Sequence, residues 1–375
     1  MVEPALTELP EVTATDLPAE HWGDWLLTQL GSALDGTMLQ AMRLVVDAVM
    51  MPRPEDLPEL QKSAEAFATG ELWHQPRRFF SFVDDPVSPL MVTDRSRRPI
   101  DGGAIISREL TSAYRPYSAA QASADASVAV NDRVLLEHWR HEPGEPSATI
   151  LALHGFSMGY PRIDAFALFA SSWFRAGFDV ALLTLPFHGA RTPKDARFSG
   201  ERFAVPHVAR LNEAVRQAIY EIHMVLGWLR QQGNAPVGLL GLSLGGYLSA
   251  LMAGLTPDLA FVIPMVPPVC MGDLAWRFFA RSRRYAGSPA PAFSREELRA
   301  AYRVHSPLTH PLRVDKARIL ILAGRGDQIV PPDHPHALWQ HWEEPEIYWF
   351  SGSHLAPFRR GRLFRTLLDH VRRCV

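Results

Sequence analysis

Short apolar runs alternate with amphipathic stretches over most of this chain. Six of these runs have the length of buried strands, and they lie at residues 149–153, 179–185, 237–240, 259–264, 318–323 and 346–350. Between them, apolar positions recur at the three- and four-residue steps of helices over residues 164–175, 208–231 and 363–371. Such alternation predicts an α/β fold with a mostly parallel central sheet covered by helices on both faces.

The first third of the chain has a different pattern. Residues 22–51 predict an amphipathic helix with a break near Gly31 or Gly36, and residues 57–69 predict a second, shorter helix. Residues 70–106 mix aromatic and basic positions and predict no element. Strands at the edge of the sheet are expected at residues 109–117, 126–130 and 133–141. We therefore predict a helical and irregular N-terminal extension over residues 1–107 and a second domain over residues 108–375.

Composition and charge argue against several classes of partner and against a membrane span. A net charge of −2 over 375 residues gives no reason to expect nucleic acid or an anionic membrane as the main partner. No signal peptide is evident, and the longest apolar run, residues 259–271, contains three prolines and is too short for a stable membrane span. The two cysteines make no disulfide framework. The expectation is a cytoplasmic protein, and its oligomeric state stays open.

A glycine-rich turn after the run at 237–240 carries the first chemical signal. The pattern Gly-x-Ser-x-Gly, centred on Ser243, stands between an apolar strand and a helical stretch. A serine at so sharp a turn has strained backbone angles, and glycines are needed where larger side chains would collide with neighbouring backbone. This is the context of a nucleophile elbow. The alternative is a strand–helix turn whose serine is buried and hydrogen-bonded.

A serine nucleophile needs a base, and the base needs an acid that orients it. Asp327 follows the strand expected at 318–323, and His354 follows the last strand, at 346–350. Because the carboxyl ends of parallel strands meet at one edge of the sheet, we expect both residues beside Ser243. Each could instead be an ordinary loop residue, and Asp333 is the second candidate for the acid.

An oxyanion hole is expected from two backbone amides. Leu244 directly follows the serine, and Phe156 lies in the His-Gly-Phe loop after the run at 149–153. The hydroxyl of Ser157 is a further candidate donor.

These motifs resemble those of a known superfamily. From about Arg133 to the C-terminus, the chain resembles an α/β-hydrolase of the serine esterase type, with LALHGF, GLSLGG, AGRGDQIVP and GSHLAP in the family's order. The segment LPFHGARTPKD is similar to the Pro-Tyr-Tyr-Gly-x-Arg-x-Pro-Lys hallmark of a poorly characterised abhydrolase-domain family. A serine at the elbow argues against the dehalogenases and epoxide hydrolases of this fold, which use aspartate there. The resemblance implies no cofactor, and residues 333–336 (Asp-His-Pro-His) are better explained as a surface turn than as metal ligands.

The same resemblance implies where substrate binds. The fold commonly carries a cap between the strands expected at 259–264 and 318–323, and we place a helical cap at residues 272–311. Trp276, Phe278 and Phe279 are candidates for an acyl pocket in that cap, although a helix that packs into the core explains them equally well. His188 follows another strand on the same edge, where it either faces substrate or fixes its loop.

Together these residues predict a serine hydrolase that cleaves a small-molecule carboxylic ester or thioester through a Ser-His-Asp triad and an acyl-enzyme. Acyl transfer, or amide or peptide hydrolysis, would use the same triad. A non-catalytic binding protein on a hydrolase fold is the alternative outside enzymes, and it would have no need of the three residues together.

Overall fold

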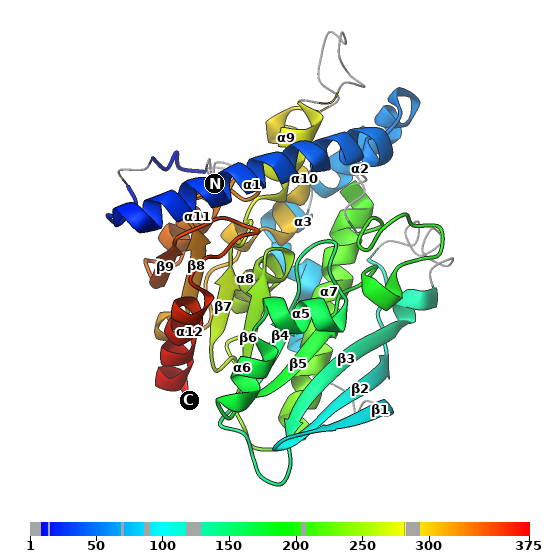
Figure 1. The fold of residues 1–375 in the computed structure, drawn as a ribbon. Helices are drawn as coiled ribbons and strands as arrows, with labels where there is room; N and C mark the ends of the chain where they lie inside the picture. Colours follow the sequence, from blue (N-terminus) through cyan, green and yellow to red (C-terminus); the bar gives the residue numbers. More distant parts are fainter. Residues whose placement is uncertain are drawn as a thin grey trace.

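The computed structural model describes residues 9–13, 16–68, 71–85, 91–117, 129–203, 208–280, 282 and 293–375. In this part of the chain one nine-stranded sheet runs in the order β1-β2-β3-β5-β4-β6-β7-β8-β9 (Figure 1). The strands are β1 (Val92–Ile100), β2 (Gly103–Thr111), β3 (Arg133–His141), β4 (Thr149–Leu153), β5 (Asp179–Thr184), β6 (Val237–Leu242), β7 (Val262–Met265), β8 (Leu320–Gly324) and β9 (Glu346–Phe350).

The sheet is mostly parallel. Neighbouring strands from β5 through β9 pair in parallel, whereas β1, β2 and β3 form an antiparallel edge that joins β5. Because β4 lies between β5 and β6, Ile150 pairs with Val180 on one side and with Gly238 on the other. The carboxyl ends of these strands therefore share one edge of the sheet.

Helices cover the sheet and its carboxyl edge. They are α1 (Trp22–Val45), α2 (Leu57–Ala68), α3 (Glu71–His74), α5 (Pro161–Ala167), α6 (Ala170–Arg175), α7 (Val208–Gln231), α8 (Leu244–Leu255), α9 (Met271–Phe279), α10 (Arg295–Tyr302), α11 (Asp333–His341) and α12 (Arg360–Cys374). None of the helices in the described ranges combines the length and the apolar character that crossing a bilayer requires.

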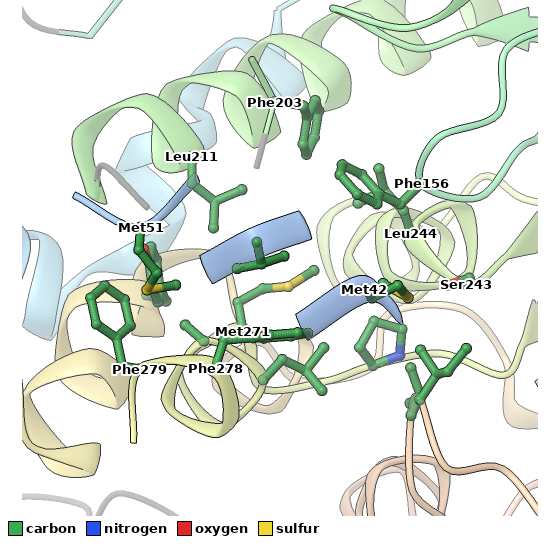
Figure 2. A pocket seen from close by; sticks show the side chains of 17 residues that line it. Met42, Met51, Phe156, Phe203, Leu211, Ser243, Leu244, Met271, Phe278 and Phe279 are labelled. Atoms are coloured by element: carbon green, nitrogen blue, oxygen red, sulfur yellow. The ribbon is translucent and has the colours of Figure 1, made fainter. Parts of the chain in front are cut away.

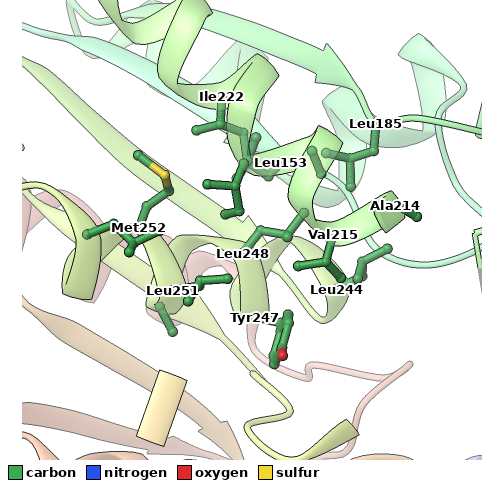
Figure 3. Packing of buried hydrophobic residues seen from close by; sticks show 14 of the residues in the cluster. Leu153, Leu185, Ala214, Val215, Ile222, Leu244, Tyr247, Leu248, Leu251 and Met252 are labelled. Atoms are coloured by element: carbon green, nitrogen blue, oxygen red, sulfur yellow. The ribbon is translucent and has the colours of Figure 1, made fainter. Parts of the chain in front are cut away.

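Hydrophobic clusters fill both faces of the sheet. Side chains of β4 alternate between them: Leu151 and Leu153 belong to the cluster that contains α7 and α8, and Ile150 and Ala152 to the one that contains α6 and α12. Figure 3 shows Leu248 of α8 surrounded by residues of β4 and α7. Every residue of α8 is buried, which explains why its sequence is apolar on all sides. The predicted α/β fold with both faces covered is confirmed.

The antiparallel edge differs from the sequence prediction. The sheet begins at Val92, within the segment for which no element was predicted and which was placed in the extension. The sequence of β1, VTDRSRRPI, is mostly exposed and is held by its ladder to β2 and by ion pairs such as Arg95–Glu109. Charged edge strands discourage pairing with other chains, and they carry no apolar alternation that a sequence pattern could reveal.

Two other strand predictions near this edge were wrong. The strand expected at residues 109–117 starts earlier, at Gly103, and ends at Thr111. In place of the strand expected at 126–130, Ala129–Asp132 form a 3-10 helix, and residues 126–128 lie outside the described ranges. The division of the chain at residue 107 stays a prediction, although the sheet itself starts before it.

Helix α1 is continuous, and it crosses the top of the molecule from the side of α11 to that of α2 (Figure 1). The predicted break near Gly31 or Gly36 is absent. A Cβ at Gly31 would lie 3.0 Å from the Ser353 backbone nitrogen, so this glycine permits close packing and not a bend. By contrast, the helix expected over residues 164–175 is divided into α5 and α6 at Phe169, which has left-handed backbone angles (φ 59°).

The polar face of α1 is the face that packs on the protein. Its buried residues are Asp24, Thr28, Gly31, Asp35 and Leu39. Large apolar side chains of the same helix face outward, with Trp22 76% and Leu30 56% exposed. This is the reverse of the usual amphipathic helix, in which the apolar face is buried.

Helix α9, which begins one residue earlier, and helix α10 occupy the segment 272–311, for which a cap was predicted. Asp273 of α9 joins them through an ion pair of 2.7 Å with Arg299 of α10. Residues 281 and 283–292 of this segment lie outside the described ranges. The cap stays a prediction, but the side chains of its helices can be placed relative to the site.

Candidate active site

Ser243 stands at the turn between β6 and α8. Its backbone angles, φ 54° and ψ −110°, lie in a region that residues other than glycine rarely adopt. The flanking glycines allow close approach of backbone: a Cβ at Gly241 would lie 2.0 Å from the Gly245 carbonyl oxygen, and one at Gly245 would lie 2.1 Å from that of Leu153. The turn thus has the geometry that the Gly-x-Ser-x-Gly pattern predicts.

Ser243, His354 and Asp327 form one hydrogen-bonded chain. His354 Nε2 lies 2.9 Å from Ser243 Oγ, and its Nδ1 lies 2.7 Å from Asp327 Oδ2. The other carboxylate oxygen of Asp327 accepts the backbone N–H groups of Ile329 and Val330 at 2.9 and 2.7 Å. Asp327 therefore points at the imidazole with both of its oxygens fixed.

Two loops carry Asp327 and His354, the candidate acid and base. The acid loop, residues 325–330, follows β8, and the histidine loop, residues 351–355, follows β9. The Gly326 N–H donates to the Gly352 carbonyl oxygen at 2.8 Å, so the loops are also joined directly. Because β8 and β9 are adjacent parallel strands, their ends place the acid beside the base.

Burial and charge set the protonation of this pair. Burial raises the pKa of Asp327, and the adjacent His354 offsets this only in part. Burial by itself would lower the pKa of His354, but the charge and hydrogen bond of Asp327 outweigh it, and the net pKa lies above the ordinary 6.5. A base with a raised pKa accepts a proton readily, but it is neutral only at correspondingly higher pH.

Two backbone amides near Ser243 are available to an oxyanion. In the described part of the chain, the N–H groups of Phe156 and Leu244 have no acceptor. Leu244 is the first residue of α8, so the positive end of the helix dipole lies at the same place. His154 fixes the Phe156 loop, since its Nδ1 lies 2.8 Å from the Gly155 carbonyl oxygen and its Nε2 accepts the Leu185 N–H at 3.0 Å.

An apolar pocket of about 200 Å³ opens beside Ser243. In the view of Figure 2, Ser243 lies at one end of the lining, and Met51 and Phe279 lie at the other. The lining comes from segments far apart in sequence: Met42, Val46, Met51, Phe156, Phe203, Leu211, Ser243, Leu244, Pro268, Met271, Leu274, Ala275, Phe278, Phe279, Tyr302, Ile329 and Val330. Such a pocket suits an apolar group of a small molecule bound beside Ser243.

Of the side chains expected to bind substrate, Phe278 and Phe279 line this pocket. Trp276 and His188 are not among the lining side chains of the described chain. Trp276 packs against the hydrophobic cluster instead. His188 is fully buried behind the lining, where its ring contacts those of Phe156 and Phe203.

Two other polar clusters singled out in the sequence are internal. Arg191, in the LPFHGARTPKD segment, is fully buried. It forms a bidentate ion pair with Glu221, with hydrogen bonds of 2.6 and 2.8 Å. The Asp-His-Pro-His segment, expected to be a surface turn, instead begins helix α11. Its His334 is buried, and Nδ1 of that residue accepts the Val269 N–H at 3.2 Å. Both side chains fix loops of the site from behind.

Sequence reasoning missed the contribution of α1. Met42 and Val46 from this N-terminal region line the pocket, and Asp35 contacts both the acid loop and the histidine loop. One signal was present: Asp24, Thr28, Gly31 and Asp35 recur at helical steps as a narrow polar stripe on a helix that is otherwise rich in apolar residues. That stripe predicts a polar contact only once its partner is known.

Comparison with known protein families agrees with this geometry. Residues 129–271 match the model of the family described as alpha/beta hydrolase domain containing 18, and residues 207–363 match that of serine hydrolase (FSH1). The chain belongs to the α/β-hydrolase superfamily. Within it, this α/β-hydrolase is of the serine hydrolase class, as predicted, and the first match includes the LPFHGARTPKD segment.

Among curated proteins, the hydrolase is similar to two uncharacterised proteins of Mycobacterium tuberculosis, from strains H37Rv and CDC 1551. Each is 32% identical over 245 residues, which cover 62% of this chain and 55% of the relative. The chain thus spans about half the length of the curated relatives it matches.

Solved structures with the same fold include two acetyl xylan esterases. The enzyme from Thermoanaerobacterium sp. has a TM-score of 0.55 and 16% identity, with 85% of this chain and 95% of that chain covered. The enzyme from Paenibacillus sp. R4 has a TM-score of 0.55 and 14% identity, with 87% and 98% covered. At these identities the likeness establishes the fold of the hydrolase and not its substrate.

Proposed function

We propose that this α/β-hydrolase cleaves a carboxylic ester or thioester whose acyl group is apolar and longer than acetyl. The observation that carries the proposal is the hydrogen-bonded chain Ser243–His354–Asp327 at one end of an apolar pocket. A nucleophile, a base in contact with it and an acid that orients the base are the parts that acyl transfer to serine requires.

In the proposed reaction, Ser243 Oγ attacks the acyl carbon while His354 Nε2 takes its proton. The carbonyl oxygen becomes an oxyanion that the Leu244 and Phe156 amides stabilise. Collapse of this intermediate breaks the bond to the leaving group, which receives the proton from His354, and leaves an acyl-enzyme. Water then attacks through the same base and releases the acid. Asp327 holds the Nδ1–H of His354 throughout, so that Nε2 is free to accept.

The pocket supports the acyl side of the proposal. Its walls are apolar almost throughout, and they begin at Ser243 and Leu244, where the acyl carbon would sit. An acetyl group would contact only this end, whereas a longer chain would reach the side chains of α9. Burial of apolar surface stabilises binding by about 25 cal/mol per Å².

The test of the proposed function is covalent labelling combined with an ester panel. We expect a fluorophosphonate probe to label the purified protein at a single serine, Ser243, identified by peptide mass spectrometry. We also expect p-nitrophenyl butyrate and octanoate to be hydrolysed with higher kcat/KM than the acetate. No labelling, together with no hydrolysis of any ester or thioester in the panel, contradicts the proposal.

Alanine at Phe278 or Phe279 should reduce activity in a way that depends on chain length. Each ring lines the pocket, so its removal should lower kcat/KM for the octanoyl ester by roughly 10–100-fold, on the scale of about 1–3 kcal/mol for a buried apolar contact. The acetyl ester should be affected less than about threefold. The measurement is kcat/KM on acetyl, butyryl and octanoyl esters.

Trp276→Ala provides the matched control, because Trp276 is an aromatic residue of the same helix that packs against the core and does not line the pocket. We expect it to change stability without a dependence on chain length. Equal losses on all three esters for Phe278→Ala and Phe279→Ala would mean that these rings only hold the fold together.

A further inference from the structure

Helix α1 packs on the candidate active site through polar residues. Its buried stripe faces the two loops that carry Asp327 and His354, and Thr28 Oγ1 of this stripe accepts the Gly352 N–H at 3.3 Å. Beside the stripe, Ser32 Oγ accepts from the Gln328 side chain at 3.0 Å. A Cβ at Gly326 would lie 2.7 Å from the Thr28 carbonyl oxygen, so helix and acid loop are in close backbone contact. The N-terminal helix is therefore built into this end of the site.

Asp35 makes the most extensive of these contacts, and it is fully buried (0% exposed). Its Oδ1 accepts from Ser353 Oγ at 2.8 Å and from the Leu355 N–H at 3.1 Å. Its Oδ2 accepts the N–H of His354 at 2.8 Å and that of Gln328 at 3.2 Å. One carboxylate thus binds the backbone N–H groups of His354 and Leu355, the hydroxyl of Ser353 and, in the acid loop, the N–H of the residue after Asp327.

The kind of side chain matters at this position. Four donors converge on two oxygens, and hydrogen bonds to an ionised acceptor are roughly twice as strong as neutral ones. In the described part of the chain no lysine or arginine forms an ion pair with Asp35, so its partners are amides and a hydroxyl. A buried carboxylate without a cation is tolerated because these donors take the place of water.

We propose that Asp35 is a positioning residue for the hydrolysis. From its place on the N-terminal helix, it fixes the position of His354 relative to Asp327. It touches neither substrate nor the reacting atoms. It acts through the backbone of the two loops, so that the imidazole is held between the acid and Ser243. This inference rests on the proposed function, and it makes α1 part of the active site.

The charge of Asp35 also acts on His354. The ionisable groups that face the imidazole are Asp327, through its charge and hydrogen bond, and Asp35, through its charge alone, and both raise the pKa of His354. Loss of the Asp35 charge should therefore lower that pKa. A residue that merely supported the fold would not move the titration of His354.

The test is Asp35→Asn, which keeps the size of the side chain. A carboxamide has one acceptor oxygen, so two of the four donors would face an NH₂ group. We expect kcat for the acetyl ester to fall by about 10–100-fold with KM within about threefold, since misplacement of a catalytic group by about 1 Å can reduce the rate about 10²-fold. The acid limb of the pH profile should move to lower pH.

Asp24→Asn is the matched control: Asp24 is a buried acid of the same helix whose ion pair, at 2.5 Å, is with Arg359. It should leave kcat and the pH profile within about twofold of wild type. Ser353→Ala is a milder second variant, because it removes one donor to Asp35 and keeps every backbone amide. We expect it to lower kcat less than Asp35→Asn does, with a smaller effect on the loops.

A readout that does not need activity separates this inference from the proposed function. The titration of His354 can be followed by NMR in protein with labelled histidine, with the resonance assigned from His354→Gln. A lower pKa of His354 in Asp35→Asn, but not in Asp24→Asn, supports the inference even if no ester is turned over. An unmoved titration, or kcat within twofold of wild type in folded Asp35→Asn and Ser353→Ala, overturns it while leaving the proposed function intact.

Discussion

Ser243→Ala should abolish ester hydrolysis while the fold is retained. The hydroxyl is the group that would form the acyl-enzyme, and its contact with His354 Nε2 at 2.9 Å is the one through which its proton would leave. Removal of a triad nucleophile commonly lowers kcat by about 10⁴–10⁶-fold, and what remains comes from the oxyanion hole and binding. Alanine fits the turn because it adds no atom.

The measurement is kcat/KM on a butyryl ester, together with fluorophosphonate labelling and circular dichroism to show that the variant is folded. Ser172→Ala, in α6 away from the site, is the control and should match wild type. Activity of Ser243→Ala within about tenfold of wild type, with contaminating esterase excluded, would falsify the assignment of the nucleophile.

Asp327→Asn should lower kcat by about 10⁴-fold with little change in structure. The carboxamide can present either its NH₂ group or its oxygen to His354 Nδ1. The N–H groups of Ile329 and Val330, however, require an acceptor at the place of the present Oδ1, so the oxygen should lie there. The NH₂ group would therefore face Nδ1 and favour the tautomer with its proton on Nε2, which cannot accept from serine. The expected loss of kcat has the same order of magnitude as that caused by the same change in the triad of a serine protease.

The pH dependence supplies a second readout of the acid. In wild type, activity should be lost as pH falls through the raised pKa of His354, so the acid limb should lie above 6.5. Because Asp327 is the main group that raises this pKa, the residual activity of Asp327→Asn should have its acid limb at lower pH. Asp333→Asn is the control. If Asp327→Asn is mild and Asp333→Asn is severe, the acid is Asp333.

The elements that could be predicted from the sequence are those whose own residues show an apolar pattern. The strands β3, β4 and β9 and helix α7 were predicted within a residue of their observed ends, because their apolar spacing reflects burial in the sheet and on its face. The polar strand β1 was missed for the complementary reason. Its stability comes from backbone pairing and ion pairs with β2, and neither leaves a pattern within the strand itself.

Helix α1 shows how tertiary contacts can reverse a local interpretation. Its apolar periodicity correctly predicts a helix, but the periodicity does not say which face is buried. Thr28 and Asp35 face inward because the loops after β8 and β9 present backbone amides that only polar groups can satisfy. The partners of α1 lie some 300 residues later in the chain, with sequence separations of 293 to 324 for these hydrogen bonds.

By itself, the sequence determined the apolar strands of the parallel part of the sheet, the elbow and the order in which Ser243, Asp327 and His354 follow their strands, because each of these depends on residues that are neighbours in the chain. Only the tertiary structure decided the distances among the three, the lining of the pocket and the place of Asp35. Those depend on which loops meet at the carboxyl edge of the sheet and on how the N-terminal helix packs across them. Such packing depends on how closely distant segments fit together and on which buried polar groups need hydrogen-bond partners. No local pattern in the sequence encodes either.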